Sequence, residues 1–320
     1  MWLIKSEEET SEAYGKRPEQ RSIEEAIKNS LVIIDKHNGP TSHQIAAWLK
    51  EMLHAKNSGV AGILDPFATG VLPVALDNAT KAMPLLVGLD KEYVGVMHLH
   101  KPVDENTLRD TVKNFFVGTI RQLPPVKSAV ARKWRERKIY FFDILEIQDR
   151  DVLFKVGCEA GTYIRKIAHD VGQRLGVGAH LTELRRTKFG PFDEQQSCSL
   201  LAVNDAYEFW RENGDERQLR KILLQIEHAV LHVKHVFVKD STIDAITNGS
   251  PVYVAGITRI QKGIEPGELV AVSSQKEELV ALGIAKMGSE EMFKRKKGSA
   301  VRTDRVFMQK GVYPKISAEK

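Results

Sequence analysis

The strongest constraint on the fold is a change of pattern near residue 230. Before this point, runs typical of strands are interspersed with stretches that repeat apolar residues at helical spacing, without a clear βαβ repeat. After it, short β-rich runs (HVFV, PVYV, ELVAV and ELVALGIAKM) are broken by Asn248-Gly249, Pro251 and Pro266-Gly267. We therefore expect a mixed α+β domain around a mainly antiparallel sheet with flanking helices, followed by a small β-barrel-like domain.

Local patterns place the main elements. The runs at 31–35, 92–100 and 151–160 are typical of strands. After the turn at 37–40, Thr41 or Ser42 can cap a helix. The core-facing residues of that helix are expected to be Ile45, Trp48, Leu49, Met52 and Leu53. Further helices are expected in ENTLRDTVKNFF and after Gly161, and the charged helical segment 203–230 is interpreted as a connector.

Charge and composition limit the class of protein. The net charge is +5 and the sequence pI is about 9.0, which weakly favours a polyanionic partner. Two cysteines, Cys158 and Cys198, provide neither a disulfide framework nor a paired zinc site. The N-terminus turns acidic by its seventh residue, unlike a signal peptide, and no apolar run approaches the roughly 18 residues that span a bilayer. We expect a soluble, cytoplasmic protein without a cofactor or a metal.

An isolated carboxylate stands in the apolar stretch ILDPFATG, at residues 63–70. Asp65 has almost no polar neighbours in the sequence, and the proline that follows it favours an extended backbone at Asp65 itself. Aspartate also commonly begins turns. The residues alone therefore leave two interpretations open, a turn residue and a catalytic acid.

Two further candidates are an arginine and a tyrosine. If Thr162 caps the helix in GTYIRKIAHD, Arg165 lies in its first turn, where the helix dipole disfavours a cation. An anionic partner would offset this cost, although a solvent-exposed arginine is an equal alternative. Tyr93 begins the strand in KEYVGVMHLH and is either a half-buried sheet residue or a catalytic group.

The stretch VKSAVARKWRERK, at residues 126–138, is almost purely cationic. One acid, Glu136, faces six cations, and Trp134 lies among them. This combination suits phosphate neutralisation and base stacking on RNA or DNA. The six cations are Lys127, Arg132, Lys133, Arg135, Arg137 and Lys138. The stretch LRRTKFG adds Arg185, Arg186 and Lys188.

Taken together, these motifs make the sequence resemble the TruB/dyskerin family of pseudouridine synthases, most closely its archaeal H/ACA members. The resemblance covers residues 30 to 312 and rests on six segments in the expected order. They are DKHNGPTSH (35–43), GILDPFATGVLP (62–73), KEYV (91–94), GTYIR (161–165), VGAHLTELRRT (177–187) and a C-terminal segment similar to the PUA RNA-binding domain.

The resemblance implies a uridine-to-pseudouridine isomerase with defined site residues. Asp65 matches the essential aspartate, Tyr93 the active-site tyrosine, Arg165 the arginine that pairs with the aspartate, and Leu184 a leucine that lines the pocket. Residues 126–138 match a mobile loop that closes over RNA. The implied domains are an N-terminal extension that packs on the PUA domain (1–30), the catalytic domain (31–230), the PUA domain (231–312) and a tail (313–320).

The chemistry requires no redox step and no metal. A target uridine must be extruded into a pocket, where Tyr93 would stack on the uracil and Asp65 would act as nucleophile or as base at the ribose. We expect the pocket to be apolar and nearly dry, with Arg165 keeping the carboxylate ionised.

The implied partners are an H/ACA guide RNA, substrate rRNA or tRNA, and three protein subunits. These subunits are a small zinc-binding protein, a glycine-rich-type protein and a kink-turn-binding ribosomal-type protein. Two alternatives are a stand-alone synthase acting on the tRNA T-loop and a non-catalytic RNA scaffold. The sequence departs from the family pattern at His37, Val60, Ile63 and Phe67, which makes the Asp65 loop atypical for the H/ACA branch.

Overall fold

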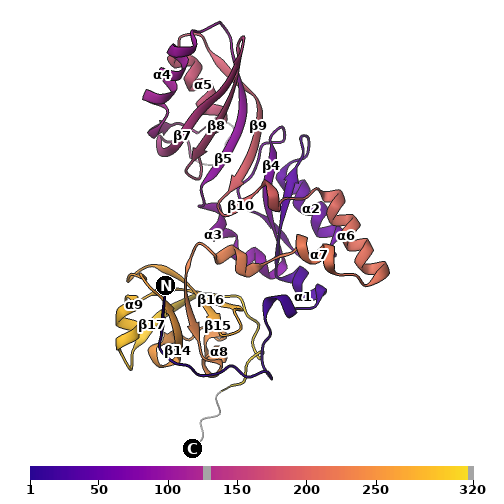
Figure 1. The fold of residues 1–320 in the computed structure, drawn as a ribbon, viewed down its shortest axis with the longest axis vertical. Coiled ribbons are helices and arrows are strands. Elements are labelled where there is room, and N and C mark those ends of the chain that lie inside the picture. The colour runs from indigo at the N-terminus through magenta and orange to yellow at the C-terminus, as the bar shows by residue number, and fades with distance from the viewer. Residues whose placement is uncertain (125–130, 316–320) are drawn as a thin grey trace, which may run out of the picture. The chain divides into compact units, whose positions relative to one another are not determined.

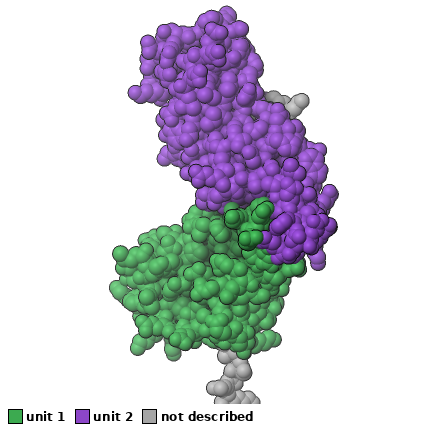
Figure 2. All heavy atoms as spheres, turned by 45° about the vertical axis from the view of Figure 1, so that its right-hand side comes forward, with its two compact units in different colours: residues 1–31, 76–82, 216–320 green, residues 32–75, 83–215 purple. Residues whose placement is uncertain are grey.

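The computed structural model describes residues 1–124 and 131–315, which form two compact units. Unit 1 combines residues 1–31, 76–82 and 216–320, and unit 2 combines residues 32–75 and 83–215 (Figure 2). Both units mix helices with sheets, so the expected α+β fold class is confirmed. Among the described helices, none has the length and apolar character needed to cross a membrane.

Unit 2 is built on a large sheet with helices packed on it (Figure 1). Its strands, two of which extend into unit 1, are β2 (Ser30–Lys36), β3 (Ser58–Val60), β4 (Thr69–Leu76), β5 (Lys91–Leu99), β6 (Gly118–Gln122), β7 (Arg135–Gln148), β8 (Asp151–Cys158), β9 (Ala179–Phe189) and β10 (Phe192–Asp193). Its helices are α2 (Ser42–Met52), α3 (Met83–Val87), α4 (Glu105–Phe115), α5 (Ile164–Arg174), α6 (Leu200–Asn213) and the 3-10 helix η3 (Glu194–Gln196).

The sheet of unit 2 brings distant segments together. Its strand order is β2-β4-β9-β5-β8-β7-β6. Strand β5 pairs antiparallel with both β8 and β9, whereas β4 runs parallel to β9, with Thr69 opposite Arg185. Alternate residues of β5 are buried, starting at Lys91, and α5 packs on β9 while α4 packs on β7. The start of β4, which follows the Asp65 loop, therefore lies next to the middle of β9.

Unit 1 contains the C-terminal β-rich segment. Its strands are β1 (Trp2–Ile4), β11 (Leu224–Gln225), β12 (Lys234–Val238), β13 (Val252–Tyr253), β14 (Ile257–Gln261), β15 (Leu269–Ser274), β16 (Leu279–Ala285) and β17 (Ser299–Val306). Its helices are α1 (Ile23–Lys28), α7 (Arg217–Ile222), α8 (Asp240–Thr247), α9 (Ser289–Lys294) and the 3-10 helices η1 (Pro18–Gln20), η2 (Asp77–Ala82), η4 (Ile226–Val230) and η5 (Val254–Gly256).

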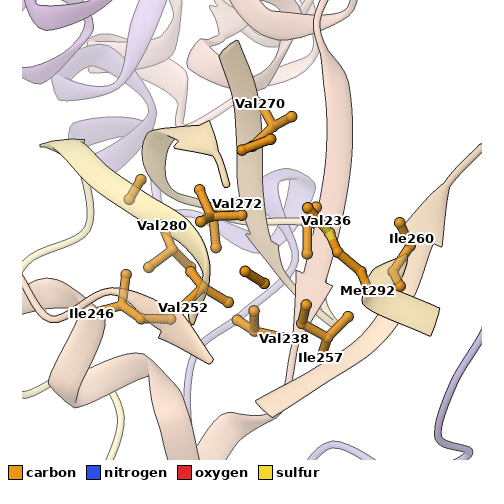
Figure 3. Packing of buried hydrophobic residues seen from close by; sticks show 14 of the residues in the cluster. Val236, Val238, Ile246, Val252, Ile257, Ile260, Val270, Val272, Val280 and Met292 are labelled. Carbon is orange, nitrogen blue, oxygen red and sulfur yellow. The ribbon is translucent and has the colours of Figure 1, made fainter. Parts of the chain in front are cut away.

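Seven of these strands form a curled sheet in the order β1-β14-β12-β15-β16-β17-β13. Valines and isoleucines from its strands converge on one core, which Met292 of α9 also enters (Figure 3). The N-terminal strand β1 forms the edge of this sheet by pairing antiparallel with β14, so that Trp2 lies opposite Gln261. Residues from both ends of the chain thus share one sheet. The predicted domain boundaries are not tested by this arrangement and stay predictions.

Three local expectations need correction. Trp48 was expected to face the core, but it is 40% exposed, and Ala46 is buried together with Ile45, Leu49 and Leu53. The stretch 126–138 was expected to be a loop throughout, but β7 begins at Arg135 and pairs with β6. The segment 203–230 is more than a connector, because α6 packs on α2 in unit 2 and buries Val203.

Candidate active site

The Asp65 loop runs from β3 to β4 and is held by backbone-directed hydrogen bonds. Lys36 at the end of β2 is fully buried, and its Nζ donates to the carbonyl oxygens of Pro66 at 2.9 Å and Ala68 at 2.7 Å. The Ser42 hydroxyl at the start of α2 accepts from the Leu64 amide at 2.9 Å. The chain around Asp65 is therefore fixed by groups that come from β2 and α2.

Glycines at both ends of the loop have positive φ angles, a backbone conformation that other residues rarely adopt. Gly62 has φ of +66° and Gly70 has φ of +97°. A Cβ on Gly70 would lie 2.2 Å from the backbone oxygen of Arg186, and one on Gly62 would lie 2.6 Å from Cε2 of Phe189. The loop needs glycine at these positions because it packs directly against β9.

Arg165 forms an ion pair with Asp65. Arg165 lies in the first turn of α5, as predicted, but Thr162 does not cap this helix. The helix begins at Ile164, the N-cap residue is Tyr163, and the Thr162 hydroxyl donates instead to the Glu159 carbonyl at 2.7 Å. The Asp65 carboxylate is the anionic partner that offsets the unfavourable position of the arginine in the helix dipole.

The ion pair is more exposed than expected. The Asp65 side chain is 47% exposed and the Arg165 side chain is 53% exposed. The expectation of an apolar and nearly dry pocket is therefore wrong for the protein chain alone. One side of the pair is covered by Phe67, because the Arg165 guanidinium lies 5.4 Å from the centre of its ring.

Tyr93 and Leu184 lie on the adjacent strands β5 and β9. Tyr93 on β5 is opposite Arg186 on β9, and Leu184 is opposite Gly95. Both side chains are only 8% exposed. Burial raises the pKa of the Tyr93 hydroxyl, the positive charge of Arg186 opposes this shift, and the charge of Asp65 adds to it. The structure thus brings Tyr93, Asp65 and Arg165 into one neighbourhood.

Arg186 lies in the interior and not on an RNA-facing surface. It is 1% exposed, and its Nε donates to the Val71 carbonyl at 2.7 Å. Burial lowers its pKa, and the neighbouring Tyr93 opposes that shift. The predicted contact between Arg186 and RNA does not fit this position, because phosphates of a bound RNA cannot reach a fully buried guanidinium. Arg186 is instead a buried structural residue opposite Tyr93 on the neighbouring strand.

A buried phenylalanine, Phe189, packs against both Arg186 and the start of the Asp65 loop. Phe189 is 0% exposed, and two cations lie close to its ring centre: Lys91 Nζ at 4.5 Å and Arg186 Cζ at 5.0 Å. Lys91 also donates to the carbonyl of Val87 at 2.9 Å. Burial, helped by the charge of Arg186, lowers the Lys91 pKa to about 8. Gly62 packs on the same ring, so Phe189 contacts the Asp65 loop as well as the two buried cations.

The predicted RNA-binding cations of residues 126–138 fall into three groups. Lys127 lies outside the described residues. Arg132 and Lys133 are exposed and precede β7, next to Trp134, which is 60% exposed and has the Arg121 guanidinium 5.6 Å from its ring. Three cations belong to β7, and they are Arg135, Arg137 and Lys138.

Arg185 forms ion pairs with two acidic residues of the protein itself. It binds both carboxylate oxygens of Asp35, at 2.9 and 3.0 Å, and its Nε contacts Glu194 at 2.5 Å. This bidentate arrangement joins β9 to β2. Its guanidinium is therefore less available to RNA than those of the exposed cations before β7.

A cavity of about 450 Å³ lies between the basic stretch and Arg165. Arg132, Trp134 and Arg165 belong to its lining, whereas Asp65, Tyr93 and Leu184 do not. Lys166, His169 and His180 add further polar groups, while Leu123 and Leu181 supply apolar surface. A cavity with aromatic, apolar and cationic walls suits a nucleotide, whose base stacks and whose phosphate needs positive charge. Across the described residues, no cluster of three or more His, Cys, Asp or Glu side chains could hold a metal ion.

Comparison with known proteins finds family matches along most of the chain. Residues 50–164 match the TruB family pseudouridylate synthase N-terminal domain, and residues 165–231 match the tRNA pseudouridylate synthase B C-terminal domain. Residues 234–307 match the PUA domain, and residues 1–46 match the DKCLD (NUC011) domain. A probable tRNA pseudouridine synthase B of Methanopyrus kandleri is 50% identical over 98% of this chain and 92% of its own length. The chain belongs to the TruB family of pseudouridine synthases.

Other relatives of the synthase support this assignment. A probable tRNA pseudouridine synthase B of Methanocaldococcus jannaschii is 46% identical over 98% of this chain and 93% of its own length. Two solved structures have a TM-score of 0.90. One is a crystal structure of a Cbf5-Nop10-Gar1 complex, 47% identical over 99% of this chain and 96% of that chain. The other is an H/ACA RNP bound to a substrate RNA containing 2'-deoxyuridine, 45% identical over 98% and 96%.

Several residues around the synthase site were not predicted from the sequence. Lys36 and Lys91 are buried at the ends of strands, and the buried Phe189 ends the strand that contains the basic stretch LRRTK. The acceptors of Lys36 lie some thirty residues away in the Asp65 loop, so local spacing contains no information about them. A lysine at the end of a largely apolar strand was the available hint, because buried lysines require nearby acceptors.

Proposed function

We propose that this synthase is the catalytic subunit of an H/ACA guide-RNA particle that isomerises uridines in rRNA or tRNA. The observation that carries the proposal is the ion pair between Asp65 and Arg165, which lies near Tyr93. Arg165 also lines a cavity suited to a nucleotide. Similarity to an H/ACA RNP structure and to a Cbf5-Nop10-Gar1 complex, each over almost the whole chain, supports the guide-dependent form.

In this proposal, each site residue has a separate task. Asp65 attacks the uridine or takes a ribose proton, and Arg165 holds its carboxylate in position through the ion pair. Tyr93 stacks on the extruded uracil, and Leu184 lines the same pocket. The bond between N1 and C1′ breaks, the base rotates, and a bond forms between C5 and C1′. The proton on C5 leaves and N1 gains one, so atoms and charge balance without a redox step.

The exposure of the ion pair indicates what RNA would contribute. About half of both side chains faces solvent in the protein alone. An extruded nucleotide would cover this exposed side, and its arrival would remove water from the carboxylate. The dry environment that the chemistry requires would thus form only when the RNA binds, with Trp134 and the exposed cations before β7 closing over it.

Partners and domain limits complete the proposal. The particle would contain an H/ACA guide RNA, a small zinc-binding subunit, a glycine-rich-type subunit and a kink-turn-binding ribosomal-type protein. Within the chain, residues 1–30 would form the extension, 31–230 the catalytic domain, 231–312 the PUA domain and 313–320 the tail. Because rRNA and tRNA are the substrates, we propose a cytoplasmic location.

The decisive experiment replaces Asp65 by asparagine in a reconstituted particle. Asp65→Asn keeps the shape of the side chain and removes its charge, so we expect loss of pseudouridine formation with RNA binding largely intact. Asp110→Asn, at an exposed position of α4, is the matched control and should leave the yield unchanged. An unchanged yield with Asp65→Asn would support the alternative of a non-catalytic RNA scaffold.

A second candidate is a guide-independent synthase that modifies the T-loop of tRNA. The names of the relatives from Methanopyrus kandleri and Methanocaldococcus jannaschii, both probable tRNA pseudouridine synthase B, favour this candidate. The two candidates differ in one measurement, the yield of pseudouridine on a naked tRNA transcript. Activity that requires added guide RNA supports the particle, and equal activity without a guide supports the stand-alone enzyme.

A further inference from the structure

Arg186 carries a buried positive charge that has no carboxylate partner. The side chain is 1% exposed, and its Nη2 is buried without a hydrogen-bond partner. The guanidinium takes part in none of the ion pairs found among residues 1–124 and 131–315. Fully buried arginines are normally paired, because a buried and unpaired charge is costly. The charge of Arg186 therefore needs an explanation.

The structural contacts of Arg186 explain its position but not its charge. Its Nε donates to the Val71 carbonyl at 2.7 Å, which joins β9 to β4. A neutral donor would make the same hydrogen bond without burying a charge. The guanidinium also lies 5.0 Å from the centre of the Phe189 ring, a contact that offsets part of the cost of burial. Both contacts hold the side chain, and neither of them neutralises it.

The excess of buried positive charge extends beyond Arg186. Lys36, Lys91 and Arg186 are 0%, 6% and 1% exposed, whereas no aspartate or glutamate is buried in the part of unit 2 that the structure describes. Burial lowers the pKa of both lysines, and the charge of Arg186 adds to this effect. The three cations therefore lie close enough to repel one another. Together they give this part of the interior a positive potential.

The positive charge of Arg186 lies next to Tyr93. The two residues are opposite each other on β9 and β5. Burial raises the pKa of the Tyr93 hydroxyl, while the charge of Arg186 and its hydrogen bonding with this hydroxyl work in the opposite direction. Arg186 also approaches the Asp65 loop, because a Cβ on Gly62 would lie 3.4 Å from its Nη1. The unpaired charge is thus placed behind the tyrosine on which we propose that the uracil stacks.

The reaction creates the negative charge that this position suits. Whichever role Asp65 plays, the electron pair of the bond between N1 and C1′ passes to the uracil when that bond breaks. The base carries the resulting negative charge until C5 bonds to C1′. Arg165 is already paired with Asp65, so its charge is largely compensated at this stage. The charge of Arg186 has no such partner in the protein.

We propose that Arg186, supported by Lys91, stabilises through Tyr93 the negative charge that the uracil carries after its bond to the ribose breaks. The guanidinium draws electron density from the tyrosine hydroxyl and ring, and an electron-poor ring stacks more favourably on an anionic base. In the interior this charge is preorganised and weakly screened. Arg186 is a positioning residue, because it acts through Tyr93. The inference rests on the proposed stacking of the uracil on Tyr93 and adds a task separate from that of Arg165.

A substrate with an electron-withdrawing base distinguishes this task from a purely structural one. The fluorine of 5-fluorouridine stabilises negative charge on the base, so the contribution of the protein to that charge matters less. A misfolded or misplaced site would instead slow uridine and 5-fluorouridine by the same factor. The experiment uses the full chain in a reconstituted particle, with either nucleotide at the target position of saturating RNA. It measures the single-turnover rate at which the target nucleotide is consumed.

We expect Arg186→Met to slow uridine by about 100-fold and 5-fluorouridine by a factor at least about fivefold smaller. Arg186→Lys keeps the charge and should keep the ratio of the two rates at its wild-type value, even where both rates fall. The control is Arg185→Met, which removes the neighbouring arginine of β9. Because Asp35 and Glu194 already pair with Arg185, this variant should leave the ratio unchanged.

Urea unfolding identifies the variants that fold. If Arg186→Met does not, Lys91→Met removes the adjacent buried cation and should change the ratio in the same direction by a smaller factor. Equal losses on the two substrates in the folded variant, or an equal change of ratio in Arg185→Met, would overturn the inference and leave the proposed function intact. A wild-type particle that converts no uridine would overturn both.

Discussion

Arg165 pairs with Asp65 from the first turn of α5, and its guanidinium also lies over the ring of Phe67, two residues after the acid. One cation therefore contacts the loop at two points. Phe67 is one of the positions at which the sequence departs from the family pattern. In this protein its ring covers one side of the ion pair, so the departure supports the position of Arg165.

Arg165 should be needed for turnover more than for RNA binding. We expect Arg165→Met to lower the rate of pseudouridine formation by about 100- to 1000-fold, because a preorganised charge beside the reacting groups is lost. Arg165→Lys should recover part of this loss, since it restores the charge without the planar guanidinium. Single-turnover assays with saturating RNA measure the effect. Arg174→Met on the same helix is the control, and an equal loss there would argue against a specific role.

Gly70 should tolerate substitution less than Gly62, the glycine at the other end of the Asp65 loop. Gly70→Ala should destabilise the fold by at least about 2 kcal/mol, because alanine disfavours φ of +97° and its Cβ would collide with the backbone of Arg186. Gly62→Ala should cost less, since the Phe189 side chain in its path can shift. Gly88→Ala has open space around its Cβ and serves as the control. Urea unfolding gives all three values, and similar costs for Gly70→Ala and Gly88→Ala would contradict this reasoning.

The buried Lys91 predicts a pH dependence of stability. Its pKa falls from 10.5 to about 8 on folding because of burial. Between these two pH values the unfolded chain holds more protons at Lys91 than the folded chain, so the free energy of unfolding rises with pH. The wild type should gain up to about 3 kcal/mol relative to Lys91→Met over this window.

Urea unfolding at several pH values from 7 to 10.5 measures this difference. Subtracting the Lys91→Met curve removes the contributions of other titrating groups. A difference between the two proteins that stays flat, or that falls as pH rises, would show that Lys91 does not carry the shift.

The predicted RNA-binding cations should separate into two functional classes. Arg132→Gln/Lys133→Gln should weaken RNA binding and lower the salt slope by roughly 2, because both side chains are exposed beside Trp134. Arg185→Gln should leave the slope nearly unchanged and reduce stability by about 1 kcal/mol, because it breaks the bidentate pair with Asp35. Fluorescence anisotropy and thermal unfolding report the two effects. The reverse pattern would place Arg185 at the RNA interface.

Sequence patterns predicted the positions of individual strands better than they predicted which strands pair. The alternating run at 151–160 and the apolar run at 31–35 are strands β8 and β2. Strand β7 was missed because its first residues, Arg135 to Lys138, belong to the cationic stretch that suggested a loop. The parallel pairing of β4 with β9 was also missed. It depends on contacts between segments more than a hundred residues apart, which a local pattern does not contain.

The candidate catalytic residues were recognised through sequence motifs. The solvent exposure and burial of the side chains around them were not predicted. The residues alone left Asp65 open as a turn residue, and the resemblance supplied Arg165 as its partner. The expected dry pocket was wrong because the sequence describes only the protein, while the exposed side of the ion pair is where RNA would bind. The buried position of Arg186 was hidden by its neighbour Arg185, since two adjacent arginines in a basic segment suggest one shared surface.

The pairing of β1 with β14 has a consequence for biosynthesis. Trp2 to Ile4 are translated well before the strand that they join, which is encoded more than 250 residues later. The nascent segment that contains β1 must therefore remain without its partner strand until β14 has left the ribosome. Addition of β1 to the edge of this sheet is therefore a late step in the folding of the newly made protein.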